Sequence, residues 1–152
     1  MIYTKDHKTH DMFDPFPFLG PKRKQRIEES WAKVFREHIL TTLPVDKILS
    51  KYDPVFGAPT KELYAMIGLM VIQQMHDMTD EEAVDQFAYN FQWHYALNIT
   101  STADADAYVS PKTLWNMREL LIERDLYHVI FEEVATKLAD VFKVDVSKQR
   151  FD

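Results

Sequence analysis

The sequence predicts an all-α protein, a compact bundle of about seven helices. Three observations point to this fold class. Hydrophobic residues recur at helical spacing, capping residues precede several of these segments, and turn-forming residues separate them. The chain has 152 residues, of which 46% are hydrophobic and 13% aromatic. A chain of this length and composition can bury a core, and it is not typical of disordered proteins.

Proline-rich and turn-forming segments separate the helices. Residues 1–21 place prolines among phenylalanines, so we expect an extended arm there, and Pro21 is suited to the first turn of the first helix. Turn-rich connectors are expected at residues 53–59 and 100–108. The expected helices occupy about residues 21–39, 44–52, 60–76, 80–89, 91–97, 111–124 and 127–142.

Capping signals justify where three of these helices begin. Thr60 is the expected N-cap of the helix that runs to about residue 76. Thr79 and Glu82 have the spacing of a capping box, in which each side chain bonds the other's backbone N–H. Ser110 followed by Pro111 combines an N-cap residue with a proline in the first helical turn.

Two hydrophobic patterns assign the core. The helix at 60–76 is apolar on nearly every side, which is typical of a central, buried helix. The last helix has a single apolar stripe formed by Tyr127, Ile130, Phe131, Val134, Leu138, Val141 and Phe142. Such a stripe predicts a helix that packs on the bundle with one face.

The composition excludes several classes of function. Without cysteine the chain has no disulfide and no thiolate for a metal or for catalysis. Its three glycines form no glycine-rich loop, which disfavours a nucleotide-binding loop. Its amino terminus is too polar for a signal peptide, and no apolar run is long enough to span a bilayer. A cytoplasmic protein without a membrane partner is expected.

The net charge of −6 requires any nucleic-acid site to be a local basic surface. Lys22, Arg23, Lys24 and Arg26 form the densest positive cluster, at the start of the first helix. Positive charge there opposes the helix dipole, and a bound phosphate would compensate it. The alternative interpretation is a solubilising helix start.

A second candidate for DNA contact is a helix-turn-helix-like unit. Residues 72–88 could form two helices joined by a short turn, although many helical hairpins share this pattern. Lys112, Thr113 and Asn116 occupy the first turns of the helix at 111–124, and those turns of a recognition helix meet base edges. Their side chains have donors for phosphate or base contacts.

The same helix also has features of an ordinary surface helix. Glu119 and Glu123 lie on the face opposite the apolar stripe and would repel DNA, which favours a solvated face. Arg118 falls beside Leu114 on the apolar side, so we expect it to form a buried ion pair and not a DNA contact.

Metal or acid–base chemistry has little support in the sequence. The candidate side chains lack a third ligand at a convincing spacing, so solvated side chains are the better interpretation. These candidates are His7, His10, His76, Asp77, Asp104 and Asp106.

Seven segments, in order and spacing, carry a family resemblance. They are LPVDKIL, DPVFGAP, ELYAMIGLMVIQQM, MTDEEAV, NFQWHYAL, SPKTLWNMREL and SKQRFD, and they cover most of residues 43–152. With them the chain resembles the amino-terminal part of bacterial insertion-sequence transposases of the DDE class, the InsH-like group.

The resemblance implies a domain order. It divides the chain into an arm at 1–21, a helical transposase domain at 22–142 and, at 143–152, a short strand cut off from a catalytic domain of RNase H type. Asp152 matches that domain's first metal-binding aspartate, although the hydroxyl residue that should follow is missing. Two divalent metals, expected to be Mg²⁺, serve the intact enzyme. This chain is expected to be non-catalytic and to need no cofactor.

The resemblance also implies a role in DNA transposition. The first hypothesis is a DNA-binding domain whose partner is duplex DNA, the terminal repeats of the element. The alternative is a helical assembly module that forms a homo-oligomer without direct DNA contact, with Phe13, Phe16 and Phe18 as its docking arm. A continuous positive surface favours the first hypothesis and an exposed apolar surface the second.

Overall fold

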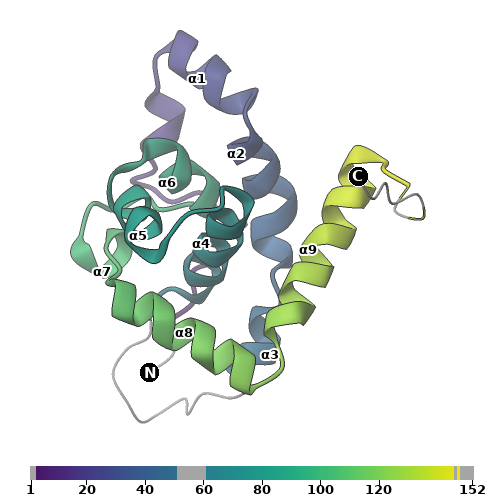
Figure 1. The fold of residues 1–152 in the computed structure, drawn as a ribbon. Helices are drawn as coiled ribbons and strands as arrows, with labels where there is room; N and C mark the ends of the chain where they lie inside the picture. The colour runs from purple at the N-terminus through teal and green to yellow at the C-terminus, as the bar shows by residue number, and fades with distance from the viewer. Residues whose placement is uncertain (1–2, 51–60, 146, 148–152) are drawn as a thin grey trace.

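The computed structural model describes residues 3–50, 61–145 and 147, and it is all-helical over these residues (Figure 1). The predicted all-α fold class is confirmed. The elements in chain order are η1 (Phe16–Phe18), α1 (Pro21–Glu28), α2 (Trp31–Val34), η2 (Phe35–Ile39), η3 (Leu40–Thr42), α3 (Val45–Leu49), α4 (Leu63–Met75), α5 (Asp80–Tyr89), α6 (Phe91–Leu97), α7 (Asp104–Ala107), α8 (Pro111–Glu123) and α9 (Tyr127–Phe142).

Helix α4 is the centre of the bundle, as its apolar sequence predicts. Ten of its thirteen residues are buried, and η3, α3, α5, α6 and α8 pack around it. Gly68 allows the closest of these approaches, because a Cβ atom there would lie 2.5 Å from Leu97 Cδ2 of α6. A larger side chain would have to displace Leu97, which is itself fully buried.

The capping predictions are confirmed at α5 and α8 and wrong at α4. Thr79 and Glu82 form the capping box of α5, and the Ser110 hydroxyl accepts a hydrogen bond from Thr113 N. At α4 the N-cap is Glu62, whose carboxylate accepts from Tyr64 N and Ala65 N. The helix therefore begins after the position expected from Thr60, which lies outside the described residues.

Two further expectations differ from the structure. The first expected helix is divided, because Ser30 leaves helical geometry and its hydroxyl caps a new helix, α2. The expected loop at 100–108 contains the single-turn helix α7. The other helix boundaries within the described residues match the predicted ones to within a few residues. The expected connector at 53–59 lies outside the described residues.

Helix α9 packs on η2 and α8 through the first half of its predicted stripe. Ile130 and Val134 are buried, whereas Phe142 at its end is 60% exposed. Lys143 then adopts a left-handed conformation that ends the helix. The expected strand at 143–152 is not formed over Lys143–Asp145, and the rest of that segment lies outside the described residues apart from Ser147.

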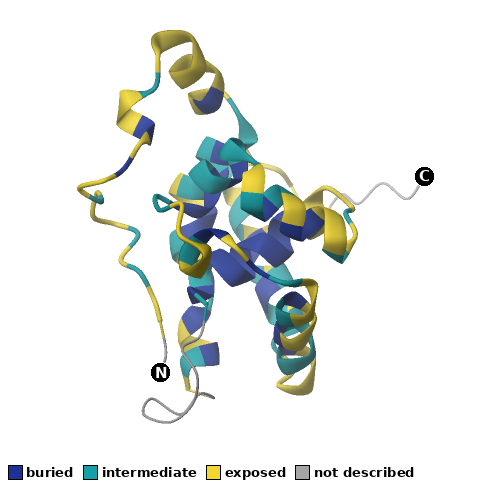
Figure 2. Ribbon diagram, turned by 90° about the vertical axis from the view of Figure 1, so that its left-hand side faces the viewer, coloured by how far each residue is buried: buried dark blue, intermediate teal, exposed yellow. Residues whose placement is uncertain are grey.

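The amino-terminal arm runs along one side of the bundle. In Figure 2 it passes from the N-terminus at the bottom to α1 at the top. Leu63 N donates a hydrogen bond of 3.3 Å to Tyr3 O, which ties the start of the arm to the start of α4. None of the helices within the described ranges has the length and apolarity needed to cross a membrane.

Candidate nucleic-acid interface

Helix α1 presents the predicted basic cluster. Lys22, Arg23, Lys24 and Arg26 are all exposed, and none of them has an ion-pair partner among the described residues. The N-cap, Gly20, offers no side chain to the first backbone N–H groups, and the first turn contains no acidic residue. The start of α1 therefore combines free N–H groups, the positive end of the helix dipole and three cations.

The cations of α1 divide between faces of the helix. Arg23 lies over the Phe91 ring of α6, with 4.9 Å from its Cζ to the ring centroid. Lys24 lines a groove of about 530 Å³ between α1, η2 and the arm, together with the buried Ile27. Lys22 and Arg26 are four residues apart and so share a face of the helix. Ile27 anchors α1 to the bundle, and all four cations remain exposed.

Helix α8 places two of its three predicted contact residues in solvent. Lys112 and Asn116 are exposed in its first two turns. Thr113 is half-buried, and its hydroxyl lies 2.9 Å from the Ser110 hydroxyl, so it contributes to the N-cap. Lys112 and Asn116 are therefore the side chains of this set that are open to a ligand.

Other residues on α8 make its outer surface mixed in character. Trp115 and Ile122 are both more than half exposed, and sequence reasoning did not single them out. The helix also carries Glu119, which is half-buried, and Glu123, which is exposed. This surface thus combines apolar, polar and acidic groups, unlike the basic surface of α1.

Arg118 forms the ion pair that its position on the helical wheel predicts, but the pair is partly exposed and not buried. Its guanidinium donates to both carboxylate oxygens of Asp80, at 3.0 and 2.6 Å, and also to Gln73 Oε1 at 3.1 Å. These bonds fasten α8 to the start of α5 and the end of α4. Hydrogen bonding from Arg118 lowers the pKa of Asp80 although partial burial opposes it, and the same pair raises the pKa of Arg118.

The two candidate groups lie at opposite ends of the molecule. In Figure 1 α1 is at the top and α8 near the bottom, and the turn about the vertical axis in Figure 2 preserves this separation. The cluster on α1 and the pair on α8 therefore do not form one continuous positive surface. They are two surfaces, of which α1 has the higher density of positive charge.

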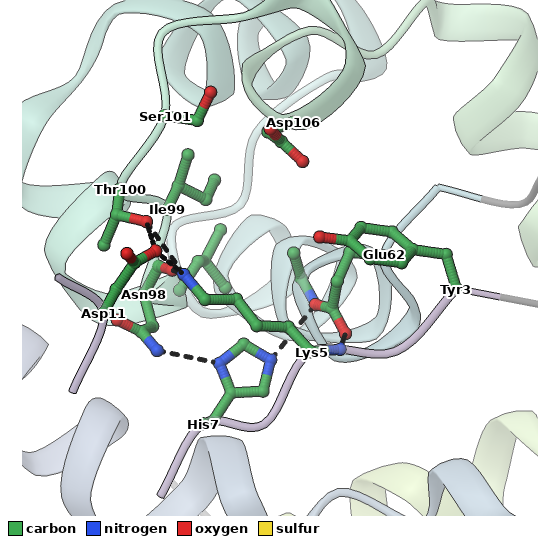
Figure 3. A pocket seen from close by; sticks show the side chains of 12 residues that line it. Tyr3, Lys5, His7, Asp11, Glu62, Asn98, Ile99, Thr100, Ser101 and Asp106 are labelled. Atoms are coloured by element: carbon green, nitrogen blue, oxygen red, sulfur yellow. Dashed lines mark hydrogen bonds and ion pairs between the residues drawn. The ribbon is translucent and has the colours of Figure 1, made fainter. Parts of the chain in front are cut away.

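A polar network that the sequence did not reveal holds the arm against the bundle (Figure 3). It surrounds a cavity of about 140 Å³ between the arm, α4 and the segment after α6. Lys5 Nζ donates to Thr100 Oγ1 at 2.8 Å and to Asn98 O at 3.2 Å, and it lies 3.3 Å from Asp11 Oδ2. Hydrogen bonds from Phe13 N, Thr100 and Lys5 lower the pKa of Asp11 to about 2.

His7 occupies the buried side of this network. Its Nδ1 lies 3.1 Å from Asn98 Nδ2, and its Nε2 lies 3.2 Å from Glu62 Oε2 at an angle outside hydrogen-bonding geometry. Asn98 Oδ1 accepts from Arg36 at 2.9 Å, which orients the amide so that Nδ2 faces His7. Nδ1 of His7 therefore faces an amide donor, and Nε2 faces the Glu62 carboxylate.

Arg36 connects the network to the arm's aromatic segment. It donates to Tyr95 O at 3.1 Å, lies 3.5 Å from Asp14 Oδ2 and stacks over the rings of Phe16 and Tyr95. Sequence patterns do not signal this arrangement, because its members come from the arm, η2 and α6.

Comparison with protein families assigns most of the chain to a known family. A family model described as "Transposase domain (DUF772)" matches residues 23–120, well over half of the chain. The chain belongs to this transposase domain family. No curated protein and no solved structure gives a significant match.

The transposase domain match includes most of both candidate surfaces. It begins at Arg23 within α1 and extends through most of α8, whereas the arm, the first two residues of α1 and all of α9 fall outside it. The family thus supports a transposase-related role for the helical part of the chain. The arm and α9 must be understood from their own contacts.

The transposase domain brings no metal-binding cluster together in the part of the chain that the structure describes. The candidate histidines and aspartates are dispersed: His7 is buried against Glu62, His10 is exposed 4.0 Å from Asp14, and His76 contacts tryptophan rings. Asp152, the candidate first catalytic carboxylate and metal ligand, lies outside the described residues, so its role stays a prediction.

Proposed function

We propose that this transposase domain binds duplex DNA at the terminal repeats of an insertion element, with α1 as the main phosphate contact. The observation that supports this most is the basic start of α1, where four exposed cations lack an ion-pair partner among the described residues. The family match and the resemblance to DDE-class transposases supply the transposition context.

The physical case for a phosphate at α1 follows from the helix dipole. Each cation in the first turn costs about 0.3–1 kcal/mol against the dipole when no anion is present. A phosphate accepts hydrogen bonds from the free N–H groups and pairs with the cations, so the same features become favourable. Because the chain's net charge of −6 opposes approach to DNA, the binding should be weak and strongly dependent on salt.

Helix α8 supplies the proposed sequence-reading contact. Asn116 can form two hydrogen bonds with an adenine, and Lys112 can meet a neighbouring phosphate or guanine. The bonds from Arg118 to Asp80 and Gln73 would hold the helix in place during such contact. Helices α1 and α8 lie at opposite ends of the molecule. They would therefore contact separate stretches of DNA, or they would contact DNA at different steps of transposase assembly.

The salt dependence of DNA binding tests the α1 contact. If Lys22, Arg23, Lys24 and Arg26 each neutralise a phosphate, the log–log salt slope should be about −4, at about 0.9 per contact. Replacing the first three with Ala should flatten the slope by about 3 and weaken all duplexes alike, as fluorescence anisotropy titrations would measure.

A matched control separates local contact from net charge. Ala at Lys47, Arg124 and Lys137 removes the same charge from α3, the end of α8 and α9, and it should leave the slope near the wild-type value. Asn116→Ala should cost ~1–3 kcal/mol on the element's own ends and little on unrelated DNA. Absence of binding at low salt, or equal effects of the two triple variants, would refute the α1 assignment.

The proposed role is binding without strand cleavage. Two-metal cleavage needs several carboxylates that hold two ions, and a single candidate such as Asp152 cannot organise them. Mg²⁺ is therefore assigned to the intact transposases that the chain resembles, and the chain itself is proposed to need no cofactor.

Assembly of transposase subunits is the second candidate function, and the end of α9 favours it. Phe142 and Val144 are exposed there, and Leu138 and Val141 of the same stripe are only half-buried. A second copy that covers this surface would complete the stripe, as in a homo-oligomer.

For assembly we expect a concentration-dependent molecular mass in sedimentation equilibrium, and a monomer after Phe142→Ser. A stable interface usually buries about 800 Å² per partner. A wild-type monomer at all concentrations would remove this candidate.

A further inference from the structure

Three large apolar side chains of the arm are exposed to solvent. Met12, Phe13 and Phe18 are 81–88% exposed, whereas Phe16 between them is only 5% exposed. Burial of one such side chain contributes about 1.5–3 kcal/mol, so their exposure forgoes a substantial stabilisation. From the sequence, Phe13, Phe16 and Phe18 are expected to form one docking arm. In the structure Phe16 is buried as an anchor, whereas Phe13 and Phe18 are exposed.

The backbone displays Phe18 from a well-anchored turn. Phe16 packs edge-on against Phe91 and Tyr95, with ring centroids 5.2 and 5.1 Å apart. Asp14 Oδ1 accepts a hydrogen bond of 2.9 Å from Phe16 N, and Phe18 N donates to Pro15 O. Phe18 therefore projects from a fixed position, and the entropy cost of ordering it on a partner is small.

The charges beside Phe18 indicate the chemistry of its partner. Phe18 precedes Lys22 by four residues, and η1 and α1 lie together at one end of the molecule (Figure 2). An exposed aromatic ring that lies a few residues before exposed cations without ion-pair partners among the described residues matches a partner that offers both phosphates and stacked bases. An apolar protein surface would match the ring but would have to desolvate the cations.

We propose that Phe18 acts as a wedge that inserts between base pairs of the duplex DNA whose phosphates are held by α1. This inference rests on the proposed DNA-binding function and extends it from phosphate contact to deformation of the duplex. Apolar wedges of this kind unstack one base step and kink DNA by about 20–90°. Contacts between α1 and the phosphates hold the duplex against the ring and offset the unstacking.

The experiment uses the whole chain and measures both the binding and the bending of DNA. A mixed-sequence duplex carries a donor and an acceptor dye at its two ends, and FRET reports bending while anisotropy reports affinity at several salt concentrations. Wild type should shorten the end-to-end distance. Phe18→Ala should abolish the shortening and lower affinity by about 5- to 150-fold, the range of aromatic–base stacking. Its salt slope should stay at the wild-type value, because the phosphate contacts remain.

Two variants serve as controls. Phe18→Trp keeps a large aromatic ring and should restore the bend. Tyr89→Ala removes another exposed aromatic ring, at the end of α5, and should bend DNA as wild type does. Because Phe18 is exposed, all variants should retain the wild-type circular dichroism and melting temperature.

The outcomes test the wedge separately from the proposed DNA-binding function. Wild-type DNA binding without bending, or equal bending by Phe18→Ala, overturns the wedge and leaves the DNA-binding proposal standing. Complete absence of DNA binding overturns both. A wild-type oligomer that Phe18→Ala dissociates, with DNA bending unchanged, assigns the ring to a protein interface and overturns the wedge.

Discussion

Replacing Arg36 with Ala is expected to lower the free energy of unfolding by about 3 kcal/mol, near the lower end for breaking a buried ion pair. The guanidinium bonds Asn98 Oδ1 and Tyr95 O and stacks over Phe16, and it is the cation nearest to the buried carboxylate of Asp14. Its removal would leave the carboxylate of Asp14, which is 4% exposed, without its nearest charge partner.

Urea denaturation would measure this loss, and hydrogen exchange would locate it. The amides of residues 3–19 should lose protection in Arg36→Ala, because the arm is joined to η2 and α6 through this side chain. Arg36→Lys should fall between wild type and Ala, since an ammonium keeps the charge but not the planar fork. Arg124→Ala, at an exposed position, should change stability by less than about 0.5 kcal/mol. Wild-type stability of Arg36→Ala would contradict the anchoring role.

The all-α fold was predictable because its signals are local. The capping box of α5 involves residues three apart, and Ser110 with Pro111 marks α8 within two residues. The burial of α4 follows from a run that is apolar on all sides. The break at Ser30 was missed because the hydrophobic spacing continues across it, while a hydroxyl cap decides where the helix restarts.

The candidate site was likewise predictable only where its residues are close together in the sequence. The exposed cations of α1 come from one short run, and the ion pair of Arg118 follows from its place on the helix wheel. The arm network could not be predicted, since Lys5 meets Thr100 across 95 positions of sequence. For the same reason no local pattern tells Phe16, which fits against α6, from Phe18, which remains exposed.

Glu62 is the second side chain whose loss should have a large effect, because it has two roles at once. Its carboxylate caps α4 through Ala65 N at 2.7 Å and Tyr64 N at 3.2 Å, and it binds the arm through Lys5 N at 3.1 Å. An N-cap contributes about 0.5–2 kcal/mol, and each buried donor left without a partner costs about 1–3 kcal/mol. We expect Glu62→Ala to lower the free energy of unfolding by about 3 kcal/mol in urea titrations at neutral pH.

The pH dependence of this stabilisation shows how much of it comes from the charge of the Glu62 side chain and how much from its shape. Burial raises the pKa of Glu62, but the contact with His7 and the hydrogen bonds from Lys5 N and Ala65 N outweigh it, and the pKa lies below the ordinary value of 4.5. A lowered folded-state pKa means that the stabilisation is complete above 4.5 and is lost as the pH falls through the lower folded-state value. The difference in stability between wild type and Glu62→Gln should therefore shrink as the pH falls below 4.5. Glu132→Gln, at an exposed position of α9, should show no such change. A difference that stays constant down to acid unfolding would mean that the cap depends on the shape of the side chain and not on its charge.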